Sequence, residues 1–556
     1  RLDEQAVPPE KMEINHASCS KNNRGDSPMT LPTPRVRDFK LGFSQPQDYG
    51  RAREVLAAAG YTDDGVPKVL GVDAITCQSR DNKHKAAFLR QTQPLTPVNQ
   101  LIRLFLLSAS VPLKEAQAAV APMGIEPWVA AGLLAVENDR VRALVKLIPF
   151  GDFWIAHDPP MLVGRDAQVD YVMGIGGSTL TVAGVTLRRP SRNSLDLGAG
   201  CGIHALLAAP HSERVSAVDR NPRATVFAAF NAALNGLNHV TCLTGDRFEP
   251  VADQSFDLIV SNPPFVIGPR AKYIYRDSGL FGDEFCQSLV RHAPAVLAQD
   301  GYCQFLFNWA HYKDQPWQER LPSWFEGTGC DALVLRTYTT DPSDYALSWI
   351  NRNESMDPAN ISETYNQWME FFDQHGIEAI SAGIITMRKS SRGSNWVVVD
   401  DGPKKLLGDC GWDLELVFKL RDYLHDKAAG NDALLNTALR VHPSVRFNHQ
   451  FNPAEGRWVD SQAEVCRVAG LAYTAGVDSH ITKLISGCDG SKTLRELASQ
   501  LAASLGRDMD AVAPHVCMVV RGLMERAFLV PVGVRVMVPS PAEQASVSRS
   551  SDETPR

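Results

Sequence analysis

The middle of the chain predicts an α/β fold, a doubly wound parallel sheet that is flanked by two smaller α+β modules. Apolar runs of strand length alternate with helical patterns between about residues 161 and 315, which indicates a parallel sheet with helices on both faces. The first strand runs into a glycine-rich turn at 196–202, and a later strand ends in a double proline at 263–264. Such turns collect at the carboxyl edge of an open sheet, where ligands bind.

The predicted elements follow one another in a regular order. Short apolar runs bounded by Gly, Asp or Pro predict the strands, and longer patterns that begin or end at Pro and Gly predict the helices. The strands are expected at 193–200, 215–219, 240–246, 256–265 and 302–309, and the helices at 204–209, 222–236 and 285–301. A strand at 331–338 and a helix around 365–375 extend the pattern, so we predict one sheet domain over residues 161–400.

The composition is that of a globular protein with several domains. Of 556 residues, 44% are hydrophobic and 21% are charged, which excludes a disordered chain, a collagen-like repeat and a coiled-coil rod. The 56 basic and 63 acidic residues give a net charge of −7, so bulk charge does not favour nucleic acid, although a local basic patch is compatible with it. Because no apolar run approaches 18 residues, we expect no spanning helix and no membrane partner.

The eleven cysteines are scattered and form no CxxC pair. This pattern argues against a disulfide framework and against a zinc cluster, so we expect no metal, and it is typical of a reducing cytoplasm. The first residues show no charged-then-apolar signal, so export is not expected.

The two ends of the chain predict modules of a different kind. Residues 1–35 and 540–556 are polar and predict a disordered leader and a disordered tail. Residues 36–160 predict three helices followed by a hairpin, a winged-helix-like pattern, and residues 410–538 predict a second such module. A module of this kind docks nucleic acid or protein, or simply packs against an enzyme, and the pattern leaves both open.

The first motif with chemical meaning contains Asp196, Gly198, Gly200 and Gly202 between a strand and a helix. Glycines let the backbone turn sharply and let a ligand approach it closely, and the helix start behind them suits a carboxylate or phosphate. An ordinary turn and a dinucleotide site are alternatives, but the GxGxG spacing differs from the GxGxxG of dinucleotide binders.

Two acidic residues end the next two strands. Asp219 is placed to accept hydrogen bonds from ribose hydroxyls, or else to cap the helix that begins at Pro222. Asp246 can accept a hydrogen bond from the amino group of an adenine. Arg247 and Phe248 would then wall that pocket, unless they belong to the surface and the core.

The most specific motif is Asn262-Pro263-Pro264-Phe265, at the end of a buried strand. Two prolines fix a rigid turn there because they cannot continue the ladder of the sheet. The Asn262 amide oxygen and the Pro263 carbonyl are both acceptors, so together they can hold the two hydrogens of a planar –NH₂ group. Phe265 offers a flat face on which a base or an amide can stack.

Together the four motifs, over about residues 165–310, resemble class I S-adenosylmethionine-dependent methyltransferases. The last motif resembles the amino-nitrogen branch: small methyltransferase domains that modify guanine N2 or adenine N6 in RNA or DNA, and release-factor glutamine N5-methyltransferases. The resemblance implies a Rossmann-like, seven-stranded methyltransferase sheet and S-adenosyl-L-methionine as cofactor. The implied cofactor-binding residues are Asp196, Gly198, Gly200 and Gly202 for the methionine part, Asp219 for the ribose, Asp246 for the adenine, and Asn262. The implied catalytic residues are Asn262, Pro263, Pro264 and Phe265.

Two further segments bear on the resemblance. Gly176, Ser178 and Thr179 lie where family members often close the cofactor pocket, although a plain glycine-rich turn explains them equally well. The motif ends in Phe265 where the glutamine enzymes usually have Tyr, while residues 273–285 are similar to a Gly-Asp/Glu stretch of that branch and of RNA relatives.

The implied activity is transfer of a methyl group to a planar amino nitrogen. The two end modules and Phe265 favour an exocyclic amine of a nucleic-acid base, with RNA before DNA, as the acceptor. A glutamine of a release-factor-like protein is the alternative acceptor, and a non-catalytic cofactor-binding scaffold is the alternative of another class. The GxGxG spacing disfavours a nicotinamide-dependent oxidoreductase.

Overall fold

The structure of the chain is a computed structural model. It describes residues 39–73, 84–159, 169–269, 273–353, 358–392, 394–427, 430–454 and 456–537. The predicted leader at 1–35 and the predicted tail at 540–556 lie outside the described residues.

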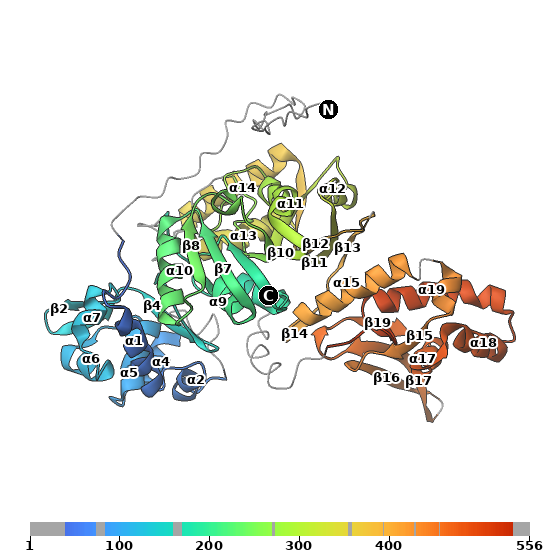
Figure 1. The fold of residues 1–556 in the computed structure, drawn as a ribbon, viewed down its shortest axis with the longest axis horizontal. Coiled ribbons are helices and arrows are strands. Elements are labelled where there is room, and N and C mark those ends of the chain that lie inside the picture. Colours follow the sequence, from blue (N-terminus) through green and yellow to red (C-terminus); the bar gives the residue numbers. More distant parts are fainter. Residues whose placement is uncertain are drawn as a thin grey trace, which may run out of the picture.

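An eight-stranded, mainly parallel sheet forms the centre of the molecule and confirms the predicted fold class (Figure 1). Its strands are β6 (Ser191–Leu197), β7 (Ser212–Asp219), β8 (Val240–Thr244), β9 (Phe256–Ser261), β10 (Leu297–Tyr312), β11 (Cys330–Thr340), β12 (Ile377–Lys389) and β13 (Val397–Asp401). In space they run β13-β11-β12-β10-β9-β6-β7-β8, and only β12 is antiparallel to its neighbours. The sheet has one strand more than the seven predicted, because β13 adds a parallel edge strand to β11.

The strand order reverses between β6 and β9. From β6 the chain proceeds outward to β7 and β8, whereas from β9 it proceeds the other way to β10. In an open α/β sheet a crevice forms at this reversal, outside the carboxyl ends of the strands. The sheet therefore places its ligand site where β6 and β9 end, at the glycine turn and the double proline.

Helices cover the sheet on both faces. The seven that follow or precede its strands are α8 (Gly177–Val185), α9 (Ile203–Ala208), α10 (Pro222–Leu234), α11 (Glu284–Val296), α12 (Trp317–Ser323), α13 (Pro342–Asn353) and α14 (Pro358–His375). Alternate strand residues serve the two faces: Leu258 and Leu333 belong to the core beneath α8, whereas Ile259 and Val334 belong to the core beneath α11. The strands read as continuous apolar runs because both of their faces are buried.

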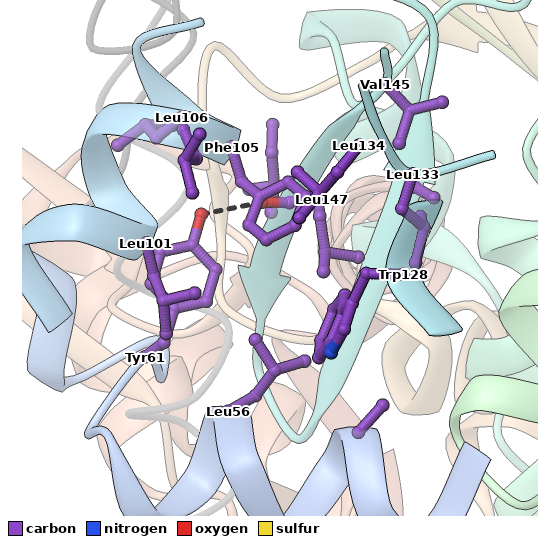
Figure 2. Packing of buried hydrophobic residues seen from close by; sticks show 14 of the residues in the cluster. Leu56, Tyr61, Leu101, Phe105, Leu106, Trp128, Leu133, Leu134, Val145 and Leu147 are labelled. Atoms are coloured by element: carbon purple, nitrogen blue, oxygen red, sulfur yellow. Dashed lines mark hydrogen bonds between the residues drawn. The ribbon is translucent and has the colours of Figure 1, made fainter. Parts of the chain in front are cut away.

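The N-terminal region consists of short helices and two small antiparallel sheets. Its elements are α1 (Pro46–Ala58), α2 (Gly65–Leu70), α4 (Lys85–Gln91), α5 (Pro97–Leu101), a π-helical turn (Ile102–Leu106), β1 (Val111–Pro112), α6 (Leu113–Ala119), α7 (Ile125–Ala130), β2 (Leu134–Glu137), β3 (Arg140–Ala143), β4 (Lys146–Phe150) and β5 (Phe153–His157). Strands β1, β3 and β2 form one sheet, and β4 and β5 form a hairpin. Figure 2 shows the core of this region, where the Tyr61 hydroxyl donates to the Leu147 carbonyl at 2.7 Å.

The N-terminal region and the central domain share a single hydrophobic core. The buried cluster that contains Leu56 and Trp128 also contains Phe227 and Phe230 of α10. Figure 1 shows α10 between the sheet and the N-terminal elements. The region is therefore packed onto the sheet domain.

Two asparagines, one in α10 and one just past its end, fasten the β4–β5 hairpin. Asn231, which is fully buried, accepts from the Ala156 N–H at 2.7 Å and donates to the Ala156 carbonyl at 2.8 Å. Asn235 bonds the N–H and carbonyl of Trp154 in the same manner, at 2.9 and 2.8 Å. Each side-chain amide takes the place of a neighbouring strand, so the exposed edge of β5 is paired.

The C-terminal region packs on the face of the sheet that α8 covers. Its elements are β14 (Leu406–Leu407), α15 (Gly411–Asp426), α16 (Asn431–Leu435), β15 (Ala438–Val441), β16 (Val445–Ala454), β17 (Arg457–Arg467), β18 (Gly470–Leu471), β19 (Thr474–Val477), α17 (Ser479–Ser486), β20 (Asp489–Thr493), α18 (Leu494–Leu505), α19 (Met509–Glu525) and β21 (Leu529–Pro531). Leu414 and Phe418 of α15 share a core with Val182 of α8. Arg388 of β12 pairs with Asp422 of α15 at 2.8 Å. In the part of the chain described above, no helix is both long and apolar enough to cross a membrane.

Candidate functional site

A cavity of about 500 Å³ opens at the carboxyl ends of β6, β7 and β9. Its size falls within the usual range for small-molecule sites. Seven of the residues predicted from the sequence line it: Gly198, Gly200, Asp219, Asp246, Asn262, Pro263 and Pro264. Residues that are up to 66 positions apart in the sequence therefore meet in one place.

The glycine turn forms one wall of this cavity. Gly198 and Gly200 have φ angles of +72° and +55°, in the left-handed region that glycine adopts without strain. A Cβ at either position would meet no atom within 4 Å. Both residues thus leave a cradle of open space that a ligand can fill against bare backbone.

Asp219 fixes the shape of that cradle. One carboxylate oxygen accepts from the Gly200 N–H at 2.8 Å and the other accepts from the Asn221 N–H at 2.8 Å. Burial raises the pKa of this carboxyl, and the two N–H groups oppose the rise. The alternative role as helix cap is excluded, because the cap of α10 is Asn221, whose side chain accepts from the Arg223 N–H at 3.0 Å.

Asp196 and Gly202, which were also predicted to bind the cofactor, lie behind the wall and do not line the cavity. Asp196 is buried and accepts from the Ala205 N–H at 2.8 Å, which ties the end of β6 to the start of α9. Burial raises its pKa to about 7, the Ala205 N–H opposes this, and the nearby Asp219 charge adds to it. A Cβ on Gly202 would lie 2.9 Å from the Ala228 Cβ, so this glycine lets α9 pack against α10.

Asp246 and Arg247 also line the cavity. The Arg247 Nε donates to Asp246 at 3.0 Å, and the Asp246 side chain is 41% exposed, so the carboxylate is available to a ligand. Phe248 is buried in the core beneath α11 and does not line the cavity.

The Asn-Pro-Pro turn also lines the cavity. The Asn262 Nδ2 donates to the Ser178 Oγ of α8 at 3.1 Å. Pro263 is buried, and Pro264 is half-buried beside it. Phe265 was predicted to stack on the acceptor, but it does not line the cavity: it packs between the cluster that contains Phe305 and the cluster that contains Trp368.

Several residues of the wall were missed or only touched on by sequence reasoning. The rings of Tyr171 and Tyr275 both line the cavity, with centroids 5.7 Å apart in an edge-to-face arrangement. Thr179 lines it too, whereas Gly176 does not. His204 also lines it, and burial, assisted by the Arg188 charge, lowers its pKa to about 4, so the imidazole is neutral. The only sequence signal for His204 is its position two residues after the last glycine of the turn.

The segment that carries Tyr171 is held by an ion pair. Asp158 accepts from the Val172 N–H at 2.8 Å and from the Arg223 Nε of α10 at 3.2 Å. The Asn221 side chain donates to the Asp170 carbonyl at 2.9 Å. This wall of the cavity therefore depends on α10 and on the end of the N-terminal region.

A sheet that reverses its strand order at a glycine-lined cavity, with acidic residues after β7 and β8 and an Asn-Pro-Pro turn after β9, is the arrangement of the class I methyltransferase fold. Residues 176–325 match the family model described as "Methyltransferase small domain". Residues 58–144 and 415–531 match two models that are each described as a domain of unknown function, DUF7059 and DUF7782.

Two curated relatives each match about a fifth of the chain. A "Release factor glutamine methyltransferase" of Geobacter sulfurreducens is 37% identical over 125 residues, 19% of this chain and 42% of the relative. A "Ribosomal protein uL3 glutamine methyltransferase" of Bradyrhizobium diazoefficiens is 37% identical over 120 residues, 19% of this chain and 38% of the relative. The chain thus spans less than half the length of these two relatives.

A "tRNA1(Val) (adenine(37)-N6)-methyltransferase" of Actinobacillus pleuropneumoniae is matched over more of its length, at 25% identity over 230 residues, 40% of this chain and 93% of the relative. Among solved structures, a methyltransferase from Pyrococcus furiosus aligns at 16% identity over 38% of this chain and 82% of that one. The TM-score of 0.23 is too low to support an inference.

Proposed function

We propose that this protein is an S-adenosylmethionine-dependent N-methyltransferase whose acceptor is a planar amino nitrogen, an exocyclic amine of an RNA base. The observation that carries the proposal is the convergence of the glycine cradle and the Asn262-Pro263-Pro264 turn on one cavity. The cradle suits a cofactor, and the turn suits an acceptor nitrogen that faces it.

The residues present fit S-adenosylmethionine. Gly198 and Gly200 leave the space that its methionine part requires, and Asp219 and Asp246 offer carboxylates to its ribose and adenine. When bound there, the cofactor supplies an electrophilic methyl group on a sulfonium. The described residues contain no group of three or more His, Cys, Asp or Glu that could hold a metal ion.

The protein's own contribution is to orient the acceptor and to stabilise its developing charge. An amino nitrogen conjugated to a ring or a carbonyl is a poor nucleophile. Because the Asn262 Oδ1 and the Pro263 carbonyl are acceptors, they can bond both hydrogens of that nitrogen and favour the positive charge that develops on it. Alignment of the reacting atoms lowers the activation free energy further, by on the order of 7–11 kcal/mol in favourable systems. The methylated nitrogen then releases one proton to water, so no strong base is needed.

Two observations bear on the acceptor. The match to the tRNA adenine methyltransferase spans 93% of that relative, which supports a base acceptor. The 37% identity to the glutamine methyltransferases supports a protein glutamine as the second candidate. Tyr171 and Tyr275 offer rings on which either planar group can stack, and a base must first leave its own stack.

The flanking parts of the chain are included in the proposal. Residues 36–160 and 410–538 are proposed as winged-helix-like modules that hold the substrate beside the cavity. A cytoplasmic location is proposed as well, and the free state of all nine described cysteines supports it.

The test is to incubate the enzyme and cofactor with a tritiated methyl group in a cell extract, and then to treat the product with nuclease or with protease. We expect nuclease to remove the label. Label removed only by protease would contradict a base acceptor and leave a protein, such as one methylated on glutamine, as the acceptor. If S-adenosylhomocysteine binds in calorimetry and neither pool is labelled, the protein is the non-catalytic scaffold, and the proposal fails.

A further inference from the structure

Ser178 contacts the side chain on which the proposed chemistry depends. Its Oγ lies 3.1 Å from the Asn262 Nδ2. Across the described ranges this is the one hydrogen bond that the Asn262 side chain makes within the protein. Ser178 stands 84 positions earlier in the sequence, as the second residue of α8.

The orientation of the Asn262 amide decides what the acceptor meets. An Asn side chain has a donor end and an acceptor end of nearly the same shape. With the Nδ2 end bonded to Ser178, the Oδ1 end is left for the hydrogens of the acceptor nitrogen. The Ser178 hydroxyl can accept from the Nδ2 or donate to the Oδ1, so the hydrogens of the acceptor nitrogen select the oxygen end of the amide, and Ser178 fixes where the side chain lies.

The helix that carries Ser178 is capped at its start and tied to the sheet at its end. At the start of the helix, the Gly176 N–H donates to the Thr179 hydroxyl at 3.3 Å. Just past its end, the buried Gln304 of β10 accepts from the Leu187 N–H and donates to the Val185 carbonyl, both at 2.8 Å. The helix therefore acts as a rigid support between the centre of the sheet and the Asn-Pro-Pro turn.

The C-terminal region holds the same helix. The Cys410 N–H, which immediately precedes α15, donates to the Gly184 carbonyl of α8 at 2.7 Å. Val182 and Val185 of α8 share a core with Leu414 of α15. The hydroxyl that faces Asn262 is thus positioned by the sheet and by the C-terminal region together.

We propose that Ser178 is a positioning residue for methyl transfer, which holds the Asn262 side chain in the conformation that lines the cavity. The inference rests on the proposed function for its catalytic meaning, and it predicts a structural effect that does not need activity.

The first experiment compares crystal structures of the wild type and Ser178→Ala, both with S-adenosylhomocysteine. We expect the Asn262 side chain to lose its single orientation in the variant. Thr181→Ala is the matched control: it removes a hydroxyl from the same helix, one that donates to the Gly177 carbonyl at 3.0 Å and does not contact Asn262. An unchanged Asn262 side chain in Ser178→Ala overturns the inference, whatever the activity of the protein.

The second experiment measures methyl transfer to the RNA pool labelled by the wild type. Since one neutral hydrogen bond is lost, we expect kcat of Ser178→Ala to fall about 2- to 13-fold with KM for the cofactor unchanged. Ser178→Thr keeps a hydroxyl and should restore much of the rate. In combination with Asn262→Ala, the Ser178→Ala change should cost nothing further, because the two residues act as one unit.

Different results contradict the proposed function and the positioning role of Ser178. A wild type that labels neither RNA nor protein contradicts the proposed function alone, since the crystal structures still decide the orientation of Asn262. An active wild type with full activity in Ser178→Ala contradicts the positioning role alone. A fall in Ser178→Ala that adds fully to the fall in Asn262→Ala also contradicts it, because Ser178 would then act by another route.

Discussion

Two glycines of the same turn should respond differently to substitution by alanine. In Gly202→Ala the new Cβ would lie 2.9 Å from the Ala228 Cβ and 3.0 Å from its Cα, and the residue has a φ of +81°. The left-handed backbone costs about 1–2 kcal/mol for a residue with a Cβ, and overpacking against α10 costs about 1–3 kcal/mol. We therefore expect Gly202→Ala to lose about 2–5 kcal/mol of stability.

Gly200→Ala carries the left-handed cost alone, about 1–2 kcal/mol, because nothing lies within 4 Å of its Cβ. That Cβ would occupy space in the cavity, so we expect the substitution to weaken ligand binding. If the methyl group displaces the ligand as overpacking does, affinity for S-adenosylhomocysteine falls about 5- to 150-fold.

Thermal unfolding and calorimetry with S-adenosylhomocysteine measure the two effects separately. At about 1 °C per kcal/mol for a chain of 556 residues, Gly202→Ala should melt roughly 1–3 °C below Gly200→Ala, with the ligand affinity of the folded protein nearly intact. The reasoning is refuted if Gly202→Ala retains its melting temperature and loses ligand affinity. Gly202 would then belong to the cofactor cradle, as the sequence motif alone suggested.

Three further results are expected. Asn262→Ala should bind S-adenosylhomocysteine within about twofold of the wild type and lose turnover on the order of 10²- to 10³-fold, as measured by methyl transfer; unchanged turnover would remove Asn262 from the mechanism. Because burial raises the folded-state pKa of Asp196 from 3.8 to about 7, the wild type should lose stability relative to Asp196→Asn as the pH rises from about 4 to about 7; parallel melting curves over that range would contradict this. Asn231→Ala leaves the buried N–H of Ala156 unpaired and should cost about 2–4 kcal/mol in urea unfolding, more than Asn235→Ala, and equal costs would weaken the argument from burial.

The sequence predicted the parts of the fold that depend on local patterns. The apolar runs predicted at 215–219 and 256–265 are strands, although the second ends at Ser261, and Pro222 and Gly236 do bracket α10, because turn and cap chemistry acts over a few residues. Strand β13 was not foreseen, since an edge strand is defined by its partner β11, some 65 residues earlier.

The sequence predicted which segments form the candidate site, but not which of their residues line the cavity, because that depends on contacts between distant segments. Gly200 and Gly202 look alike in a motif, and only the contact with Ala228 separates a cavity residue from a packing residue. Phe265 looked available for stacking because the two hydrophobic clusters that enclose it come from segments such as Phe305 and Trp368. Long-range contacts of this kind leave no local signature.

The shared cores have a consequence for how such a protein can be divided. Leu56 and Trp128 belong to the same core as Phe227 and Phe230, so excising residues 1–160 would strip one side of α10 to water. Removing the C-terminal region would likewise uncover Val182. We therefore expect that the sheet domain cannot be expressed as a stable protein without its two flanking regions. The three regions must be kept together in one chain.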